Sequence, residues 1–425
     1  MVRSQAPRGT EDLLPERISL YRHIFGTCRD VFARHAYREL RTPLFEETSL
    51  FVRSLGEVTD VVEKEMFTVT RGDTSVTFRP EGTASAVRAY LEHHLDKVRP
   101  FQKFFYMGPM FRFERPQAGR QRQFDQIGIE ALGSSSPLLD AEVILLAHRC
   151  FSELGLKNFA IHVNSIGDRD DRTRFREVLR SYMADHLNDR CDNCKKRIER
   201  NVFRMLDCKE NRCRATNAEA PRFLDHLSDA SRDRFNTTIS ALEKLEIPHI
   251  IDHAIVRGFD YYTHTVFEVR CPDLGARDAI CGGGRYDNLI ADMGGPELGS
   301  TGFAIGVTPM ILALELQKHP CTETVDSGSP IFVAAVTDAE REAAFLLTDR
   351  LRQANLTVDT DFEGKSLKAQ FKAAGKRGVE LMLVLGPDEI AAGVVKVKDF
   401  KTSEESSLAT DENLANALRA RLQSD

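Results

Sequence analysis

The sequence predicts a protein of mixed helices and strands, with a helical module inserted into a large first domain and a small α/β domain at the C-terminal end. Three observations lead to this prediction. At 425 residues the chain is too long for a single hydrophobic core. The segment from about 168 to 245 is charged and helical in pattern, and strand-like sequence lies on both sides of it. The segment 318–330, KHPCTETVDSGSP, has almost no apolar side chains to bury, which is typical of a linker.

Composition narrows the class of protein. Hydrophobic residues make up 42% of the chain and charged residues 29%, and no apolar run reaches the roughly 18 residues of a membrane span. The N-terminus lacks the hydrophobic core of a signal peptide, so we expect a cytoplasmic protein without a membrane segment. A formal net charge of −6 argues against non-specific coating of nucleic acid but allows a local basic face. Nine cysteines, an odd number, argue against a disulfide framework.

The first 165 residues mix strand and helix patterns. Within 106–130, two alternating segments joined by the polar loop ERPQAGRQR predict a β-hairpin. A helix is expected to begin at Pro137, with Asp140 and Glu142 near the positive end of its dipole. Its buried face is expected to consist of Val143, Leu146, Ala147 and Cys150. After the helical module, the segment 256–269, VRGFDYYTHTVFEV, alternates like a strand.

Beyond the linker, strands alternate with helices over about 95 residues, which predicts a small α/β domain with a largely parallel sheet. The expected elements are a strand at 330–336, a helix at 338–355, a strand at 357–362, a helix at 365–378, strands at 380–386 and 394–400, and a last helix.

The loop of the predicted hairpin carries Arg112, Arg115, Arg120 and Arg122. Four guanidinium groups on one hairpin repel each other unless an anion lies between them, and the planar fork of arginine matches a phosphate. The pattern therefore favours a phosphate-binding hairpin. A loop of solvated arginines is the alternative.

Two other stretches place polar side chains beside glycine. In FRPEGTASAVRAY, Glu81 and Thr83 precede a helix, where they are either functional or a simple cap, with Thr83 as N-cap and Glu81 solvated. In AICGGGRYDNL, three successive glycines allow a close approach to the backbone, although a bulge between core strands gives the same pattern.

Polar groups also crowd the start of the strand at 256–269. Arg257, Asp260, Tyr261 and Tyr262 all form hydrogen bonds readily, and taken alone they fit a polar strand entrance with a tyrosine pair in the core.

Several motifs together resemble the histidyl-tRNA synthetase family of class II aminoacyl-tRNA synthetases. GPMFRFERPQAGRQRQFDQIGIEALG resembles motif 2, VRGFDYYTHTVFEV resembles a histidine-binding signature of the family, and CGGGRYDNL with GSTGFAIGV resembles the approach to motif 3. PRGTEDLLP and RTPLFEETSLFVRSLGEVTDVVEKEMF are similar to its N-terminal and dimer-forming regions, and KSLKAQFKAAGKRG and GVVKVKD to its anticodon-binding domain.

The resemblance implies an α+β architecture. It consists of a class II catalytic domain at 1–325, built on an antiparallel sheet flanked by helices, with a helical insertion at about 168–245 and an α/β anticodon-binding domain at 330–425. It also implies a homodimer that activates L-histidine with ATP, accompanied by Mg²⁺, and transfers it to the 3′ end of tRNA(His).

Site roles follow from the resemblance, residue by residue. Arg112 and Arg257 correspond to arginines that contact the α-phosphate from two sides, which makes them the expected catalytic residues. Arg120 and Phe124 correspond to positions around the phosphates and adenine of ATP. The positions implied for histidine are Glu81, Gly82, Thr83 and Gln126 at its ammonium end, and Glu130, Tyr261 and Tyr262 at its imidazole. For Asp260 we expect a role in orienting Arg257 or a neighbouring tyrosine.

One departure from the family pattern lies in motif 3. Where the family has an acid and an arginine, this chain has Thr308 and Pro309, so the usual arginine contact to ATP is missing. The departure leaves open an alternative function, a non-catalytic regulatory paralogue that binds histidine.

Two clusters add further hypotheses. Cys191, Cys194, Cys208 and Cys213 form two pairs inside the helical insertion, a spacing that suits either a structural zinc site or four reduced cysteines. Lys368, Lys372 and Lys376 recur every fourth residue, so they share one helix face. Such a face is usually just solvated, but the resemblance favours contact with tRNA phosphates.

Overall fold

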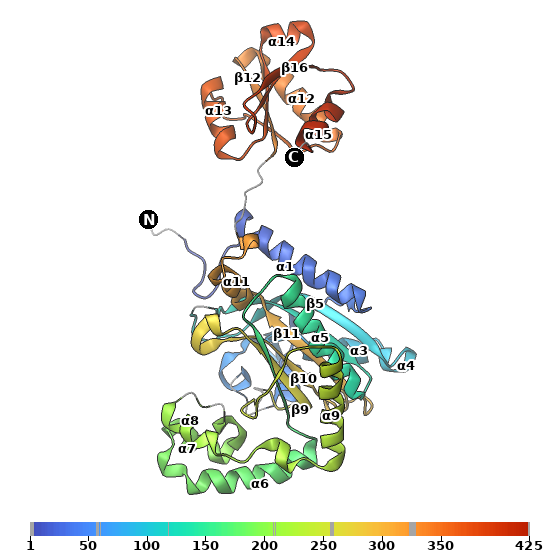
Figure 1. The fold of residues 1–425 in the computed structure, drawn as a ribbon, viewed down its shortest axis with the longest axis vertical. Coiled ribbons are helices and arrows are strands. Elements are labelled where there is room, and N and C mark those ends of the chain that lie inside the picture. The colour runs from blue at the N-terminus through green and yellow to red at the C-terminus, as the bar shows by residue number, and fades with distance from the viewer. Residues whose placement is uncertain are drawn as a thin grey trace. The chain divides into compact units, whose positions relative to one another are not determined.

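The computed structural model describes residues 4–56, 59, 61–117, 119–206, 208, 210–255, 259–322 and 329–423. They form two compact units, one containing nearly all of residues 1–322 and one containing 323–425 (Figure 1). Among the described helices, none combines the length and apolar character that crossing a bilayer requires.

An eight-stranded sheet forms the centre of the first unit. Its five inner pairings are antiparallel, and only the two edge strands pair in parallel. The predicted antiparallel sheet is therefore confirmed, as is the hairpin within 106–130. In sheet order the strands are β1 (Arg38–Glu39), β5 (Gln102–Phe111), β6 (Gln123–Leu132), β11 (Ser300–Gly306), β10 (Ala279–Arg285), β9 (Thr263–Arg270), β7 (Ala160–Ser165) and β8 (Ile250–Ile251).

Helices cover one face of this sheet with an apolar core. The predicted helix beginning at Pro137 is present, and all four residues of its expected buried face are inaccessible to solvent. The last helix of the predicted insertion packs against it, so that helix belongs to this layer (Figure 1). The helices of the layer are α1 (Pro15–Arg34), α5 (Pro137–Glu153), α9 (Asp229–Lys244) and α11 (Val307–Leu316).

A second core lies against the opposite face and extends into the helical insertion. Phe175, Phe203 and Phe223 pack together at the centre of the insertion, with ring centroids 4.1 Å apart for the closest pair. The helices of the first unit on this side, outside the insertion, are α2 (Thr48–Leu55), α3 (Thr83–Glu92), α4 (Leu95–Val98) and α10 (Leu289–Asp292). The insertion contributes α6 (Arg169–Asp185), α7 (Asp192–Arg200) and α8 (Asn211–Ala218), with 3-10 turns η2 (Leu187–Asp189), η3 (Val202–Met205) and η4 (Phe223–His226).

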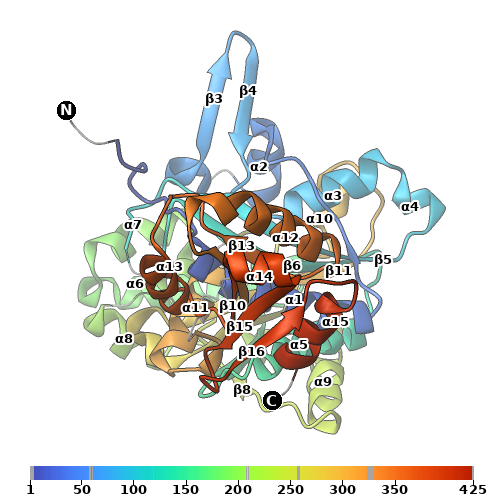
Figure 2. The same cartoon turned by 90° about the horizontal axis from the view of Figure 1, so that it is seen from above.

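A small three-stranded sheet lies beside α2. It is antiparallel in the order β2 (Phe45–Glu47), β4 (Thr74–Phe78) and β3 (Phe67–Arg71), and the β3–β4 hairpin projects from the unit (Figure 2). A π-helical turn, η1 (Val61–Glu65), leads into β3.

The C-terminal unit has a five-stranded sheet. Its strands are ordered β13 (Val358–Thr360), β12 (Ile331–Ala335), β14 (Leu381–Leu385), β15 (Val394–Asp399) and β16 (Glu405–Ala409). Only the pairings of β12 with β13 and β14 are parallel, so the expectation of a largely parallel sheet is wrong. The helices are α12 (Arg341–Gln353), which follows the turn η7 (Asp338–Glu340), α13 (Leu367–Lys376), α14 (Pro387–Ala392) and α15 (Leu414–Leu422).

The structure describes residues 318–322 and 329–330 of the predicted linker. Residues 318–322 include the turn η6 (Pro320–Thr322), and the glycine at Gly155 leaves room for the ring of His319. Residues 323–328 lie outside the described part of the chain.

Candidate active site

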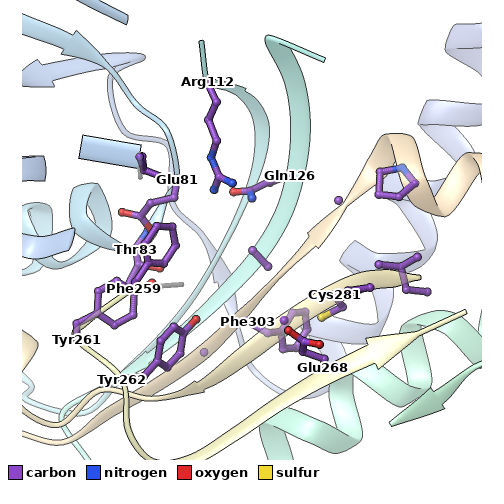
Figure 3. Close-up of a pocket in the computed structure, with 18 of the residues that line it drawn as sticks. Glu81, Thr83, Arg112, Gln126, Phe259, Tyr261, Tyr262, Glu268, Cys281 and Phe303 are labelled. Atoms are coloured by element: carbon purple, nitrogen blue, oxygen red, sulfur yellow. The ribbon is translucent and has the colours of Figure 1, made fainter. Parts of the chain in front are cut away.

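A cavity of about 480 Å³ opens on the face of the sheet opposite the α5 core (Figure 3). Strand alternation explains its floor: Ile127 and Ile129 point into the α5 core, whereas Gln126, Gly302 and Ala304 line the cavity. A side chain could not replace the glycine at Gly302, because its Cβ would lie 2.2 Å from the Ile129 carbonyl oxygen. Small residues thus keep a space open over the centre of the sheet.

Glu81 and Thr83 form one wall. Thr83 is the first residue of α3, and the Glu81 carboxylate caps the helix by accepting the backbone N–H groups of Thr83 and Ala84 at 2.6 and 2.8 Å. The simple cap considered from the sequence had Thr83 as the capping side chain and Glu81 in solvent. In the structure Glu81 is the capping side chain, and it is buried (3% exposed). Burial raises its pKa. Gly82 does not line the cavity; its missing Cβ leaves room for the Tyr106 ring.

Arg112 and Gln126 both line the cavity, and in Figure 3 their polar ends point toward the same part of it. Arg112 Nε donates to the Pro80 carbonyl at 2.9 Å, and its guanidinium lies 5.3 Å from the Phe124 ring and 5.8 Å from the Phe259 ring. Burial lowers its pKa. Gln126 is 9% exposed, and its Oε1 has no hydrogen-bond partner within the described residues. An unpartnered buried acceptor in the same cavity as a partly buried cation indicates a polar ligand.

Tyr261 and Tyr262 immediately precede β9 and line the cavity. Their rings are 4.6 Å apart, and Tyr261 also stacks on Phe259. Burial raises the pKa of Tyr261, which keeps its phenol protonated as a hydrogen-bond donor. The segment that precedes β9 therefore places two phenols in the cavity that also contains Arg112.

Glu130 lies behind the cavity wall. It is 1% exposed and accepts hydrogen bonds from Thr83 Oγ1 at 2.8 Å and from the Tyr286 hydroxyl. Thr83 and Tyr286 both line the cavity, whereas Glu130 does not. Burial raises the pKa of Glu130 to about 8. Its direct contact with an imidazole remains a prediction, and its visible contacts hold two lining side chains in place.

The four hairpin arginines do not converge. Arg112 and Arg120 line the cavity, and Arg120 also pairs with Glu114 at 2.9 Å. Arg122 instead stacks on Phe113, with its guanidinium 4.0 Å from the ring. Arg115 is exposed and is not among the lining residues. Two of the four hairpin arginines therefore share one cavity and two do not, and the phosphate-binding role of the hairpin stays a prediction.

Other predicted residues have mixed outcomes. Pro309 lines the cavity, as its place in motif 3 requires. Phe124 packs on Arg112 without lining the cavity. Arg257 lies outside the described residues, so its predicted contact stays a prediction. Asp260 contacts the insertion, where its Oδ1 accepts from Asn201 Nδ2 at 3.4 Å and its carbonyl accepts from Arg172 at 2.9 Å.

Sequence reasoning missed several residues of the site. Tyr286 follows the glycine-rich strand β10, and Phe259 and Glu268 flank the two predicted tyrosines. Each stands within or beside a quoted motif, and that position was the available signal. Arg197 and Arg204 reach the cavity from the insertion. No local pattern predicts their approach, because it depends on how the insertion packs.

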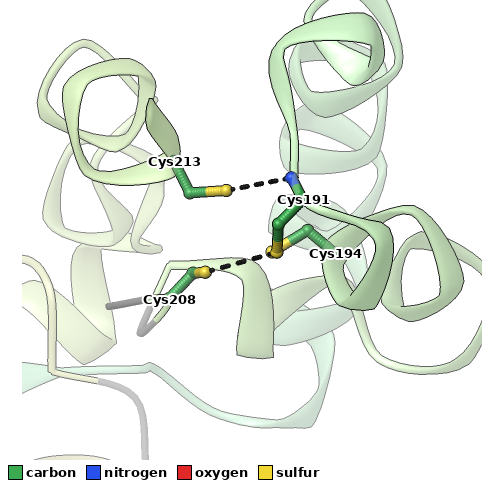
Figure 4. A group of neighbouring side chains, drawn as sticks. All are labelled: Cys191, Cys194, Cys208 and Cys213. Atoms are coloured by element: carbon green, nitrogen blue, oxygen red, sulfur yellow. Dashed lines mark hydrogen bonds between the residues drawn. The ribbon is translucent and has the colours of Figure 1, made fainter. Parts of the chain in front are cut away.

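The four cysteines of the insertion form one cluster (Figure 4). All are buried, and their four Sγ atoms lie within 4.8 Å of one another. The Sγ atoms of Cys191 and Cys208 are 3.7 Å apart, and the backbone N–H of Cys191 donates to Cys213 Sγ at 3.3 Å. Two pairs that are separate in the sequence therefore form a single group with the geometry of a metal-ligand set.

Lys368, Lys372 and Lys376 all lie on α13 and are exposed. They form a continuous basic face, as their spacing predicts.

Comparison with known proteins agrees with this geometry. A sequence model described as histidyl-tRNA synthetase matches residues 9–310, and one described as an anticodon binding domain matches residues 330–421. The chain belongs to the histidyl-tRNA synthetase family. Proteins named histidine–tRNA ligase from Desulforamulus reducens (42% identical) and Pelotomaculum thermopropionicum (44% identical) align over 96% and 95% of this chain and 97% and 95% of their own lengths.

Solved structures of the family have the same fold. The crystal structure of apo histidyl-tRNA synthetase from S. aureus has a TM-score of 0.80 at 32% identity and covers 98% of this chain and 99% of its own. A structure from Bacillus halodurans, titled an ATP phosphoribosyltransferase regulatory subunit/histidyl-tRNA synthetase, has a TM-score of 0.64 at 19% identity, with 90% and 98% covered. The latter likeness concerns the fold alone.

Proposed function

We propose that this protein is a histidine–tRNA ligase that activates L-histidine with ATP and transfers it to the 3′ end of tRNA(His). One observation carries the proposal beyond family membership: a single cavity contains the Gln126 acceptor, which has no partner among the described residues, the Glu81 carboxylate that caps α3, and the Arg112 guanidinium. The acceptors suit the ammonium group of an amino acid, and the guanidinium suits its carboxylate together with a phosphate.

The first half-reaction joins histidine to AMP. A carboxylate oxygen of histidine attacks the α-phosphorus of ATP, the bond from that phosphorus to the bridging oxygen breaks, and pyrophosphate leaves with Mg²⁺. Negative charge grows on the α-phosphate oxygens during the attack, and Arg112 stabilises it from a fixed position between two aromatic rings. Arg257 is proposed to act from the other side. Arg120 and Phe124 are proposed to bind the phosphates and the adenine.

The second half-reaction transfers the histidyl group. A ribose hydroxyl of the terminal adenosine attacks the carbonyl carbon of histidyl-adenylate, and its proton passes to a phosphate oxygen of the adenylate. The bond from the carbonyl carbon to the phosphate oxygen breaks, and AMP leaves with the bonding electron pair. The protein's part is to hold the adenylate and the RNA end together, which is a matter of positioning.

Selection of histidine depends on the polar groups at the ammonium and imidazole ends. Glu81, Thr83 and Gln126 accept hydrogen bonds from the ammonium group. The phenols of Tyr261 and Tyr262 serve the ring nitrogens, and Glu130 acts directly or through Tyr286. A site of buried polar groups rejects an analogue that lacks the matching groups by roughly 10⁴ to 10⁵.

We also propose that α13 binds tRNA phosphates through Lys368, Lys372 and Lys376, and that the protein is a homodimer. The exposed lysine face and the match to an anticodon-binding model support the first proposal. The similarity of the segment 41–67 to a dimer-forming motif supports the second.

The four-cysteine cluster is proposed to bind a structural zinc ion. A tetrahedral zinc site with Zn–S bonds of about 2.3 Å places its sulfurs about 3.8 Å apart, close to the 3.7 Å between Cys191 and Cys208. Arg190 gives independent support. It is fully buried beside the cluster and donates to the Cys213 carbonyl at 3.0 Å, with no carboxylate partner in the described part of the chain. Metal-bound thiolates carry the negative charge that a buried guanidinium needs.

Metal analysis of the purified protein tests the zinc proposal. One zinc per chain is expected, with loss of the metal in Cys194→Ser and retention in Cys281→Ser, a buried cysteine outside the cluster. Absence of zinc from the wild-type protein would refute the site.

Charging of tRNA(His) with labelled histidine tests the function. We expect ATP-dependent formation of histidyl-tRNA and no charging with other amino acids. The alternative, a regulatory paralogue that binds histidine, is favoured only by Pro309 and predicts histidine binding without any charging.

A further inference from the structure

Two arginines of the helical insertion line the same cavity as Arg112. They are Arg197 on α7 and Arg204 on η3, and both are only partly exposed. Arg197 Nη1 donates to the Arg204 carbonyl at 3.3 Å, which connects the two elements. That bond occupies one of five N–H donors on the Arg197 guanidinium. The insertion, which carries no residue assigned to the reaction so far, therefore presents two cations to the reaction centre.

One aromatic ring, Phe259, connects Arg204 with the part of the cavity that Arg112 lines. Arg204 also lines a small adjoining cavity together with Phe259, and Phe259 lies 5.8 Å from the Arg112 guanidinium. The two side chains are thus neighbours of the same ring. Arg112 is the residue proposed for the α-phosphate, so we expect the next phosphates of ATP in the same cavity that these arginines line.

The charged residues that line the cavity indicate that a bound triphosphate needs more cations than Arg112 alone. Among the described residues, Glu65, Glu81 and Glu268 line it along with four arginines, and one of those, Arg120, is paired with Glu114. Pro309 occupies another lining position without offering any charge. A triphosphate and the departing pyrophosphate are strongly anionic, and guanidinium groups match phosphate oxygens in pairs. Arg197 has no carboxylate partner among the described residues, so its remaining donors suit such an anion.

We propose that Arg197 and Arg204 bind the β- and γ-phosphates of ATP and stabilise the pyrophosphate leaving group. The proposal rests on the proposed function and extends it, because it makes the helical insertion part of the activation site. The cysteine cluster brackets the two arginines: Cys191 and Cys194 stand at the start of α7, and Cys208 follows η3. The same cluster that closes the insertion therefore fixes the elements that carry both cations.

The experiment measures histidine-dependent exchange of pyrophosphate into ATP, without tRNA, for Arg197→Ala, Arg204→Ala and the double variant. Loss of a charged hydrogen bond is expected to raise the KM for ATP by about tenfold to a hundredfold per arginine, with the KM for histidine unchanged. Lys196→Ala, an exposed cation on the same helix, is the matched control and should leave both constants unchanged. Arg204→Lys, which retains the charge, should recover part of the ATP affinity, and thermal melting shows whether each variant is folded.

An unchanged KM for ATP in the double variant overturns the proposal. If the KM for tRNA rises instead in the charging reaction, the two arginines bind the RNA end and not the nucleotide. Calorimetric binding of inorganic pyrophosphate separates this inference from the proposed function. Weaker binding by the double variant supports the phosphate contacts even if the wild-type protein shows no exchange, and equal binding by both proteins contradicts them.

Discussion

Arg285 and Arg112 both lie beside the central sheet, but their surroundings differ. Arg285, at the end of β10, is fully buried and forms ion pairs with Asp140 at 2.6 Å and Asp287 at 2.7 Å. It also donates to the carbonyls of Ser134 and Ser136. Arg112 lines a cavity and donates to one backbone carbonyl, with aromatic rings on its flanks.

The difference separates a structural charge from a functional one. The donors of Arg285 are used inside the protein, which joins β10 to the start of α5. Paired acids raise its pKa, whereas burial without such pairing lowers that of Arg112. A buried cation with few internal partners is costly unless a ligand completes its surroundings. We therefore expect Arg285 to determine stability and Arg112 to determine turnover.

The largest expected effect is on stability. Arg285→Ala leaves Asp140 buried without a cation, so the free energy of unfolding should fall by about 3 to 5 kcal/mol. Denaturant unfolding measures the change. The double variant Arg285→Ala/Asp140→Ala should lose less than the sum of the two single losses, and simple additivity would argue against a coupled pair.

Arg112→Ala should remove activity while leaving the fold intact. Loss of one fixed group that stabilises transition-state charge lowers kcat by roughly 10² to 10³. Single-turnover formation of the adenylate measures the change, with Arg122→Ala as a matched control because Arg122 is on the same hairpin and stacks on Phe113. A melting temperature that falls with the activity would mean that Arg112, like Arg285, is a structural residue.

Glu130 should make the free energy of unfolding depend on pH. Burial raises its pKa to about 8, above the ordinary value of 4.5, so the folded protein keeps a proton that the unfolded chain releases. Its stabilising effect is complete below about pH 4.5 and is lost as the pH rises to about 8, at about 1.4 kcal/mol per pH unit. Urea unfolding across this range should show a smaller decline for Glu130→Gln than for the wild-type protein. If stability falls equally with pH in both proteins, a group other than Glu130 binds the proton.

The smallest expected effect lies in the C-terminal unit. Lys368, Lys372 and Lys376 are exposed, so each contributes through screened contacts with phosphates. Replacing all three with alanine should weaken tRNA binding and reduce the slope of log K against log salt by about one per lysine. Lys396→Ala, which removes a lysine paired with Glu389, is the control. An unchanged salt slope would mean that α13 is simply a solvated face.

Arg112 and Arg285 also show which features of the structure could be predicted from the sequence. Arg112 was predictable, because the hairpin and its polar loop are local patterns. The partner of Arg285 was not: Asp140 lies 145 positions away, and its local setting suggested only a favourable place in the α5 dipole. Pairings between distant elements depend on the packed fold.

The same limit applies elsewhere in the molecule. The cysteine spacing predicted a cluster that the structure assembles, because both pairs belong to one short module. The strand β16 was missed because its polar sequence, ESSLA, resembles a loop, and pairing with β15 makes it a strand. Arg197 and Arg204 were missed because only the position of the insertion over the sheet brings them to the cavity.

Histidine is proposed to be activated in the cavity that contains Arg112. Exchange of labelled pyrophosphate into ATP by the full-length protein, with and without histidine and in the absence of tRNA, tests this proposal most directly. We expect exchange that requires histidine and is lost in Arg112→Ala. A folded wild-type protein that binds histidine but gives no exchange would contradict it.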